Sequence, residues 1–230
     1  MSAPTKPFGA DLPPWPQVDF GAFGATEVKP LSRIQQLTAG FMARNWAMIP
    51  HVTHQDDADV TALEELRKKL SLAGAGIKIT PVAFLIKAAV SALREFPTFN
   101  ASLDPAGTKL ILKQYFHIGV AVDTPNGLLV PVIRDCDRKS IVEIAQELAS
   151  VAAKARTKGL SMSEMSGGCF TISSLGGIGG TAFTPIINAP ELAILGVTNT
   201  AWKPRRAHDR ALAWRCMLPL SLSYRHRGIN

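Results

Sequence analysis

Cysteine is scarce in this sequence and widely scattered. Cys136, Cys169 and Cys216 form no CxxC pair. That spacing is typical of neither a structural zinc site nor a disulfide framework, so we expect no metal and a reducing compartment. No apolar run reaches the roughly 18 residues of a membrane-spanning helix, and the first residues lack the charged start and apolar stretch of a targeting peptide. We therefore expect a soluble, cytoplasmic protein with no membrane partner.

The formal net charge of +7 does not by itself indicate a nucleic-acid partner. The basic residues are scattered through predicted helices or gathered in one late stretch that contains Lys203, Arg205, Arg206 and Arg210. We expect no nucleic-acid partner. A small polyanion, such as a nucleotide-bearing cofactor with several phosphates, fits a mildly basic enzyme, because the positive field raises its local concentration.

The composition predicts one folded domain preceded by a linker or arm. A chain of 230 residues with 47% apolar residues can bury one substantial core. Residues 1–26 are rich in proline and favour an extended linker, and the domain is expected over 27–230. Trp15, Phe20 and Phe23 are too apolar for a purely solvated linker. The second half of this arm is expected either to lie against the domain or a neighbouring subunit, or to be a mobile tail.

Local capping signals predict three helices, and a fourth helix is expected over residues 60–71. Ser32 with Gln35, and Ser140 with Glu143, have the spacing of a capping box. Pro81 follows a threonine at the start of VAFLIKAAVSALREF, which is apolar almost all round and indicates a buried helix. Helices are therefore expected over residues 32–48, 60–71, 80–96 and 140–158.

The strand signals predict a mixed sheet. The segment LILKQYFHIGVAVDT, a PNG turn at 125–127 and LLVPVI indicate a strand, a turn and a strand. CFTISSL, ELAILGV and CMLPLSLSY are three further strand candidates. Because helices and strands do not alternate in a regular βαβ order, we predict an α/β fold with a mixed sheet flanked by helices.

Four glycines in the string SSLGGIGG follow a predicted strand, but they do not form a dinucleotide-binding site. That fingerprint needs a helix after the glycines, and the string TAFTPIINAP that follows has two prolines and no helical period. The glycines are better explained if the backbone must pass close to a ligand or a partner chain beside Ser173 and Ser174.

Several strings together resemble the catalytic core of dihydrolipoamide acyltransferases, the lipoyl-linked acyl carriers of 2-oxo acid dehydrogenase complexes. These strings are PHVTHQDDADVTALEELRKKL, FNASLD, HIGVAVDTPNGLLVPVIRD, KARTKGLS, CFTISSLGGIGGTAFTPIINAPELAILGV and LPLSLSYRHRGIN, in family order over about residues 17–230. Ser-Ser-Leu-Gly resembles the acetyl-transferring, pyruvate-type branch. The resemblance implies a chloramphenicol-acetyltransferase-like fold and acetyl transfer between dihydrolipoamide and coenzyme A.

The resemblance also assigns roles to individual residues. His226 to Asn230 align with the family's terminal motif His-x-x-x-Asp-Gly, so His226 is expected to be the catalytic base and Asn230 to occupy the motif's aspartate position, paired with Arg33. A lone histidine is more often structural, and only the complete motif favours catalysis. Ser173 matches the family's hydroxyl donor to the carbonyl oxygen; an ordinary strand-end serine is the alternative.

Substrates and partners are implied in the same way. Phe183 and Leu195 match positions that line the family's substrate channel, with core packing as the open alternative for both. Coenzyme A is expected as a substrate, and the lipoyl group on a separate domain. The resemblance implies a homotrimer with His226 and Ser173 from different subunits, assembly into a larger cubic-type core, and the dehydrogenase components of the complex as partners.

Two departures from the family pattern leave alternatives open. Arg225 stands where the family has an aspartate, and the chain stops before the motif's glycine and the C-terminal helix that is expected to follow. We therefore expect a domain truncated at its C-terminal end, with activity uncertain. A noncatalytic scaffold subunit with the same fold is the main alternative, and an antibiotic acetyltransferase of the chloramphenicol type is the other.

Overall fold

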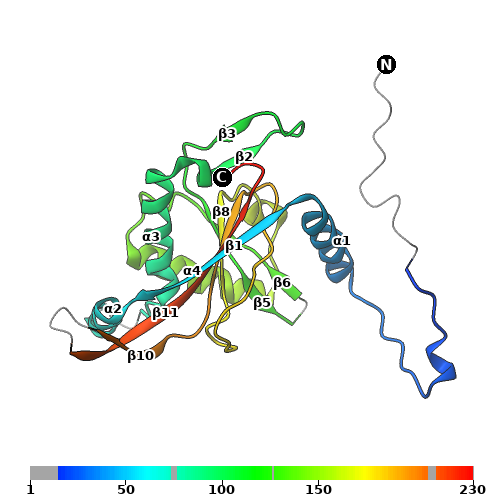
Figure 1. Ribbon diagram of the computed structural model, residues 1–230, viewed down its shortest axis with the longest axis horizontal. Helices are drawn as coiled ribbons and strands as arrows, with labels where there is room; N and C mark the ends of the chain where they lie inside the picture. Colours follow the sequence, from blue (N-terminus) through cyan, green and yellow to red (C-terminus); the bar gives the residue numbers. More distant parts are fainter. Residues whose placement is uncertain (1–14, 74–76, 126, 207–210, 230) are drawn as a thin grey trace.

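The computed structural model describes residues 15–73, 77–125, 127–206 and 211–229, and it contains the helices that the capping signals predict (Figure 1). Both capping boxes are present, at Ser32 with Gln35 and at Ser140 with Glu143. Thr80 precedes the proline-led helix but makes no side-chain cap hydrogen bond. The helices are α1 (Arg33–Met48), α2 (Thr61–Ala73), α3 (Pro81–Glu95) and α4 (Ile141–Thr157), with short 3-10 turns η1 (Phe20–Ala22), η2 (Pro97–Asn100) and η3 (Met162–Met165).

The main sheet has seven strands, and its order confirms the predicted mixed architecture. The path runs β1-β11-β9-β8-β4-β7, and β10 pairs with β11 beyond this path. The β4–β8 and β8–β9 pairs are parallel, whereas the other pairs in this sheet are antiparallel. The strands of this sheet are β1 (His51–Asp59), β4 (Ile118–Val120), β7 (Val132–Ile133), β8 (Phe170–Ser174), β9 (Ala193–Val197), β10 (Ala201–Arg206) and β11 (Leu212–Arg225).

The region 109–133 is more divided than the predicted strand, turn and strand. It contains β3 (Leu110–Leu112), β4, β5 (Val122–Thr124), β6 (Gly127–Leu129) and β7. The predicted turn does join two strands, since Thr124 pairs with Gly127 in a small β5–β6 sheet. A second small sheet pairs β3 with β2 (Ala101–Leu103). The chain leaves and re-enters the main sheet here, and a continuous β-rich composition cannot reveal such breaks.

Two strands of the main sheet, β1 and β10, were not predicted because most of their residues are polar. β1 is the sequence HVTHQDDAD at one edge of the sheet, paired only with β11 in the main sheet. β10 is AWKPRR, and its Pro204 is tolerated because β10 pairs on one side only. Charged residues on edge strands discourage unwanted pairing, so these strands have no alternating apolar pattern.

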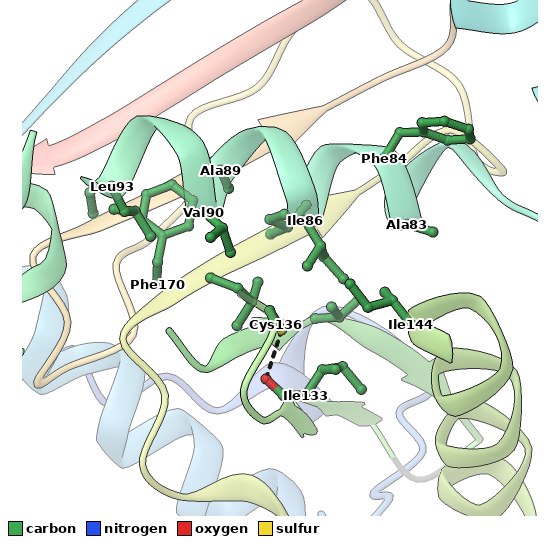
Figure 2. Close-up of a cluster of buried hydrophobic side chains, with 14 of the residues drawn as sticks. Ala83, Phe84, Ile86, Ala89, Val90, Leu93, Ile133, Cys136, Ile144 and Phe170 are labelled. Carbon is green, nitrogen blue, oxygen red and sulfur yellow. Dashed lines mark hydrogen bonds between the residues drawn. The ribbon is translucent and has the colours of Figure 1, made fainter. Parts of the chain in front are cut away.

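One face of the sheet carries the core. Phe170, Ile172 and Ile118 of the sheet pack against Ile86 of α3 and Ile144 of α4 in one large buried cluster (Figure 2). Residues adjacent along a strand point to opposite faces. The residues between these core positions, such as Thr171 and Ser173, therefore point to the other face, which is the face that carries polar side chains.

The helix α1 and the arm lie away from the core, on the far side of β1 from α3 in Figure 1. Along α1 only Asn45 is buried, and Leu37 and Phe41 remain 52% and 50% exposed. Trp15 and Phe23 of the arm are 89% and 83% exposed, so the described part of the arm does not pack against its own domain. Within the described residues, no helix has the length and apolar character to span a membrane.

Candidate active site

Four strands place small and polar residues in one row on the face of the sheet opposite α3 and α4. Ser173 on β8 lies beside Gly196 on β9, Gly196 beside Ser221 on β11, and Ser221 beside Gln55 on β1. Paired residues on neighbouring strands point to the same face. The side chain of Ser173 therefore points away from the helix-covered core, into the face that this chain leaves uncovered by α3 and α4.

Phe183 covers this row at Gly196. A Cβ atom added to Gly196 would lie 2.6 Å from Cζ of Phe183, so the aromatic ring rests directly on the glycine backbone. Any larger residue at position 196 would displace the ring. The structure thus brings Phe183 close to Ser173, which pairs with Gly196. The contact between the Phe183 ring and the backbone at position 196 leaves room only for glycine.

Leu195 lies on the opposite face from Ser173. It pairs with Ile172 on β8 and Leu222 on β11, and it packs against the buried clusters on the helix-covered side. This placement favours core packing over a substrate-channel role for Leu195, since neighbouring strand residues alternate between faces.

The glycine-rich segment after β8 forms a turn and no helix. Residues 175–192, all of which are described, contain no helical element. Gly179 and Gly180 have φ values of +111° and +96°, a backbone region that favours glycine. The backbone N–H of Gly176 donates to Oγ of Ser174 at 3.4 Å. The helix that a dinucleotide-binding fingerprint needs after its glycines is therefore not formed by this segment.

A buried carboxyl group, which the sequence analysis missed, lies beside the serine strand. Glu191 is 3% exposed, and its Oε2 accepts a 2.6 Å hydrogen bond from Oγ1 of Thr171. Burial raises the pKa of Glu191 to about 7, against the lowering effects of Thr171 and the nearby Lys113 ammonium. Burial in turn lowers the pKa of Lys113. The sequence feature that could have indicated this buried group is Glu191 itself, a single acidic residue at the start of the otherwise apolar string ELAILGV.

His226 lies in an exposed turn directly after β11. Its backbone N–H donates to the carbonyl oxygen of Pro50 at 3.1 Å, and its ring centroid lies 6.3 Å from that of Tyr224. Because β11 pairs on both sides, with β1 and β9, the strand end that precedes His226 is firmly placed. A histidine on a fixed strand end with an accessible ring can remove a proton from a bound molecule.

His226 and Ser173 do not meet within one chain. Ser221 is level with Ser173, and His226 is five positions further along β11. At a rise of about 3.3 Å per residue, the two Cα atoms are separated by more than about 15 Å. Ser173 and His226 could act on one substrate only if they came from different copies of the chain.

Arg33 is not brought to His226 by the described part of one chain. Arg33 begins α1, whereas Pro50, which holds His226, follows the end of that helix. A helix of this length separates Arg33 from the His226 turn by on the order of 20 Å. Asn230 lies outside the described residues. The pairing of Arg33 with Asn230 stays a prediction.

Arg225 introduces a poorly solvated cation beside His226. Burial lowers the pKa of Arg225, and the positive charge of Arg227 lowers it further. The Nε atom of Arg225 is buried and has no hydrogen-bond partner among the described residues. Arg227 in turn lies against Gly107, where an added Cβ atom would be 2.8 Å from its guanidinium. The sequence predicted the charge but not its burial.

Comparison with known proteins gives one family for nearly the whole chain. Residues 23–230 match the family described as 2-oxoacid dehydrogenases acyltransferase (catalytic domain). The dihydrolipoyllysine-residue acetyltransferase component of the pyruvate dehydrogenase complex from Cupriavidus necator is 55% identical over 95% of this chain and 39% of that protein. The Pseudomonas aeruginosa counterpart is 53% identical over 96% of this chain and 41% of that protein. The chain thus spans about two fifths of the length of these curated relatives.

Solved structures agree with the sequence match. The Azotobacter vinelandii dihydrolipoamide acetyltransferase, studied for the roles of one serine, one histidine and one asparagine in its catalytic mechanism, has a TM-score of 0.92 and 52% identity over 95% of this chain and 90% of that one. The cubic core of the pyruvate dehydrogenase multienzyme complex gives the same values. Chloramphenicol acetyltransferase, with a TM-score of 0.54 and 14% identity over 83% of this chain and 86% of that one, shares the fold.

Proposed function

Because the chain belongs to the 2-oxo acid dehydrogenase acyltransferase family, we propose that it transfers an acetyl group between dihydrolipoamide and coenzyme A within a pyruvate dehydrogenase complex. One observation carries this proposal: the chain retains both expected chemical groups, with Ser173 on the face of the sheet opposite α3 and α4 and His226 on the fixed end of β11. In the Azotobacter protein the histidine and asparagine studied are four positions apart, as His226 and Asn230 are here.

His226 would act as the general base. A free thiol has a pKa near 8.5 and is mostly protonated at neutral pH, so a base in contact with it raises the thiolate available at the moment of attack. The free ring nitrogen of His226 would take the proton from the thiol of coenzyme A, or from dihydrolipoamide in the reverse direction. Such a base typically contributes about 10²–10⁴-fold to the rate.

Ser173 would stabilise the charge that develops on the substrate. Attack of a thiolate on the acyl thioester moves negative charge to the carbonyl oxygen. A hydroxyl donor aimed at that oxygen contributes roughly 3 kcal/mol to the transition state. The position of Ser173 beside Gly196 and near Phe183 supports this role, because the Ser173 side chain points away from the core under α3 and α4.

The active site would form between copies of the chain, in a homotrimer. The separation of Ser173 from His226 in one chain supports this arrangement, and so does the exposed apolar face of α1 that includes Leu37 and Phe41. The arm residues Trp15 and Phe23, which are 89% and 83% exposed on their own domain, would pack against a neighbouring subunit. Light scattering should therefore detect trimers or multiples of them, and a stable active monomer would contradict the shared site.

Assembly and partners follow from the same relatives. We propose that trimers build a larger cubic-type core, that the lipoyl group arrives on a separate domain, and that the dehydrogenase components of the complex bind around the core in the cytoplasm. The net charge of +7 suits coenzyme A, which carries several phosphates. No metal is needed for the proposed chemistry, because a base and a hydrogen-bond donor suffice.

The second candidate is a noncatalytic core subunit with the same fold, and Arg225 is the observation that favours it. A partly buried cation next to the base replaces the aspartate of the family pattern. A noncatalytic core subunit would keep the surfaces that build the trimer and would tolerate Arg225. The two candidates therefore predict the same assembly but different turnover.

One assay separates these candidates: acetyl transfer from acetyl coenzyme A to dihydrolipoamide by the assembled protein. His226→Ala should abolish transfer, and Ser173→Ala should lower kcat by about 10²–10³-fold with little change in KM, because the hydroxyl acts on transition-state charge. Ser174→Ala and His54→Ala are the matched controls. The Ser174 side chain points to the opposite face from Ser173, and His54 is an exposed histidine on β1. An inactive but assembled wild type would favour the scaffold, and equal turnover in all variants would contradict both residue roles.

A further inference from the structure

His51 is not among the expected active-site residues. Its ring connects the segment that contains Ile49 with the segment that contains Ile187. Its Nε2 accepts the backbone N–H of Ile187 at 3.0 Å, and its Nδ1 lies 2.7 Å from the carbonyl oxygen of Ile49. An amide nitrogen can only donate, so Nε2 must be the acceptor. The hydrogen is therefore on Nδ1, which donates to Ile49, and the ring is in its uncharged Nδ1–H form.

Further contacts hold both ends of this connection. The ring of His51 stacks on Trp46 of α1 at a centroid distance of 5.6 Å. The carbonyl oxygen of Ile187 accepts a 3.1 Å hydrogen bond from Nδ2 of Asn45, which is 2% exposed. The backbone N–H and the carbonyl oxygen of Ile187 are thus both hydrogen-bonded to side chains. Ile49 and Ile187 are themselves buried, at 3% and 0% exposure.

The connection continues to the proposed catalytic base. Pro50 lies between Ile49 and His51, and its carbonyl oxygen accepts the backbone N–H of His226 at 3.1 Å. Arg225 and His51 are also directly paired between β11 and β1. The peptide that holds His226 is therefore fixed by the ring of His51 on one side and by the β-ladder on the other.

We propose that His51, in its uncharged Nδ1–H form, is a positioning residue that holds His226 in place through Ile49 and Pro50. This inference rests on the proposed acetyl transfer only for its kinetic consequence. A base misplaced by about 1 Å can lose on the order of 10²-fold in rate, whereas substrate binding elsewhere in the site is unaffected. His51 touches no reacting atom, and its effect would appear in kcat rather than KM.

The test uses three substitutions of His51 in the assembled protein. His51→Phe keeps an aromatic ring for Trp46 but removes both nitrogens. The amide nitrogen of asparagine is as many bonds from Cα as Nδ1, so His51→Asn can still donate to Ile49. The amide oxygen of glutamine is as many bonds from Cα as Nε2, so His51→Gln can still accept from Ile187. His54→Phe, exposed on the same strand, is the control.

We expect His51→Phe to lower kcat by about 10–10²-fold with KM within twofold for both substrates. His51→Asn should retain more turnover than His51→Gln, because only the bond to Ile49 leads to Pro50. If His51→Phe fails to assemble, the Asn and Gln comparison decides, and an equal loss in both would overturn the proposed route.

Amide hydrogen exchange gives a readout that does not depend on turnover. The His226 amide should exchange roughly tenfold faster in His51→Phe, whereas the Arg225 amide, bonded to Leu192, should keep its protection. Faster exchange at His226 in a protein whose wild type shows no transfer would leave the positioning role intact and contradict only the proposed function. Unchanged exchange at His226, or wild-type kcat in His51→Phe, would overturn the inference.

Discussion

Replacing Glu191 by glutamine should make the protein clearly more stable at alkaline pH and have a much smaller effect in mild acid. The Glu191 carboxyl is buried, and its pKa rises from 4.5 to about 7 in the folded state. Well below pH 4.5 the carboxyl is protonated in both the folded and the unfolded state, so ionisation of Glu191 does not lower the stability there. As the pH rises toward 7 the unfolded chain releases this proton first, and the folded state loses stability until both states are ionised.

The size of this effect follows from the pKa difference. Each unit corresponds to 1.36 kcal/mol, so the ionised carboxyl destabilises the folded state by about 3 kcal/mol above pH 7. Glutamine stays neutral and can still accept the hydrogen bond from Thr171. It also leaves the Lys113 ammonium without its carboxylate, which offsets part of the gain. We therefore expect a net gain of about 1–3 kcal/mol at pH 8.5.

The measurement is denaturant unfolding of wild type and Glu191→Gln at pH 5.0 and 8.5, at one protein concentration because assembly contributes to stability. Glu164→Gln is the control. Lys154 and Ser161 hydrogen-bond to Glu164 and lower its pKa to about 2. The stabilisation that Glu164 gives the folded state is therefore present above pH 4.5 and nearly constant between pH 5.0 and 8.5. An equal effect of Glu191→Gln at both pH values would refute the reasoning.

Further substitutions test the geometry of the site and one helix start. Gly196→Ala should cost about 1–3 kcal/mol in unfolding free energy, because the new Cβ would lie 2.6 Å from the Phe183 ring, and adding Phe183→Ala should recover part of it. Ser140→Ala removes a capping box and should cost about 1 kcal/mol by the same unfolding assay. Arg225→Asp, which restores the family residue beside His226, should raise kcat in the transfer assay; unchanged turnover would mean that the cation does not limit catalysis.

Local sequence determined the helices, since their signals act over a few residues. The Ser32–Gln35 and Ser140–Glu143 boxes satisfy helix-end amides within one turn, and both are present in the structure. Six strings in family order were enough to identify the family, and two of them contain Ser173 and His226. These features could be predicted because short-range hydrogen bonds and motif spacing do not depend on how distant segments pair.

Only the tertiary structure decided which side chains meet. Alternation along a strand places neighbouring residues on opposite faces, but only the pairing of strands determines which residues share a face. That pairing places Phe183 close to Ser173 and Leu195 against the core. β1 escaped prediction because an edge strand needs no apolar pattern. The high pKa of Glu191 and the protonation form of His51 depend on burial and on an amide far away in the chain. Such long-range contacts form only when the whole sheet assembles, so no local pattern encodes them.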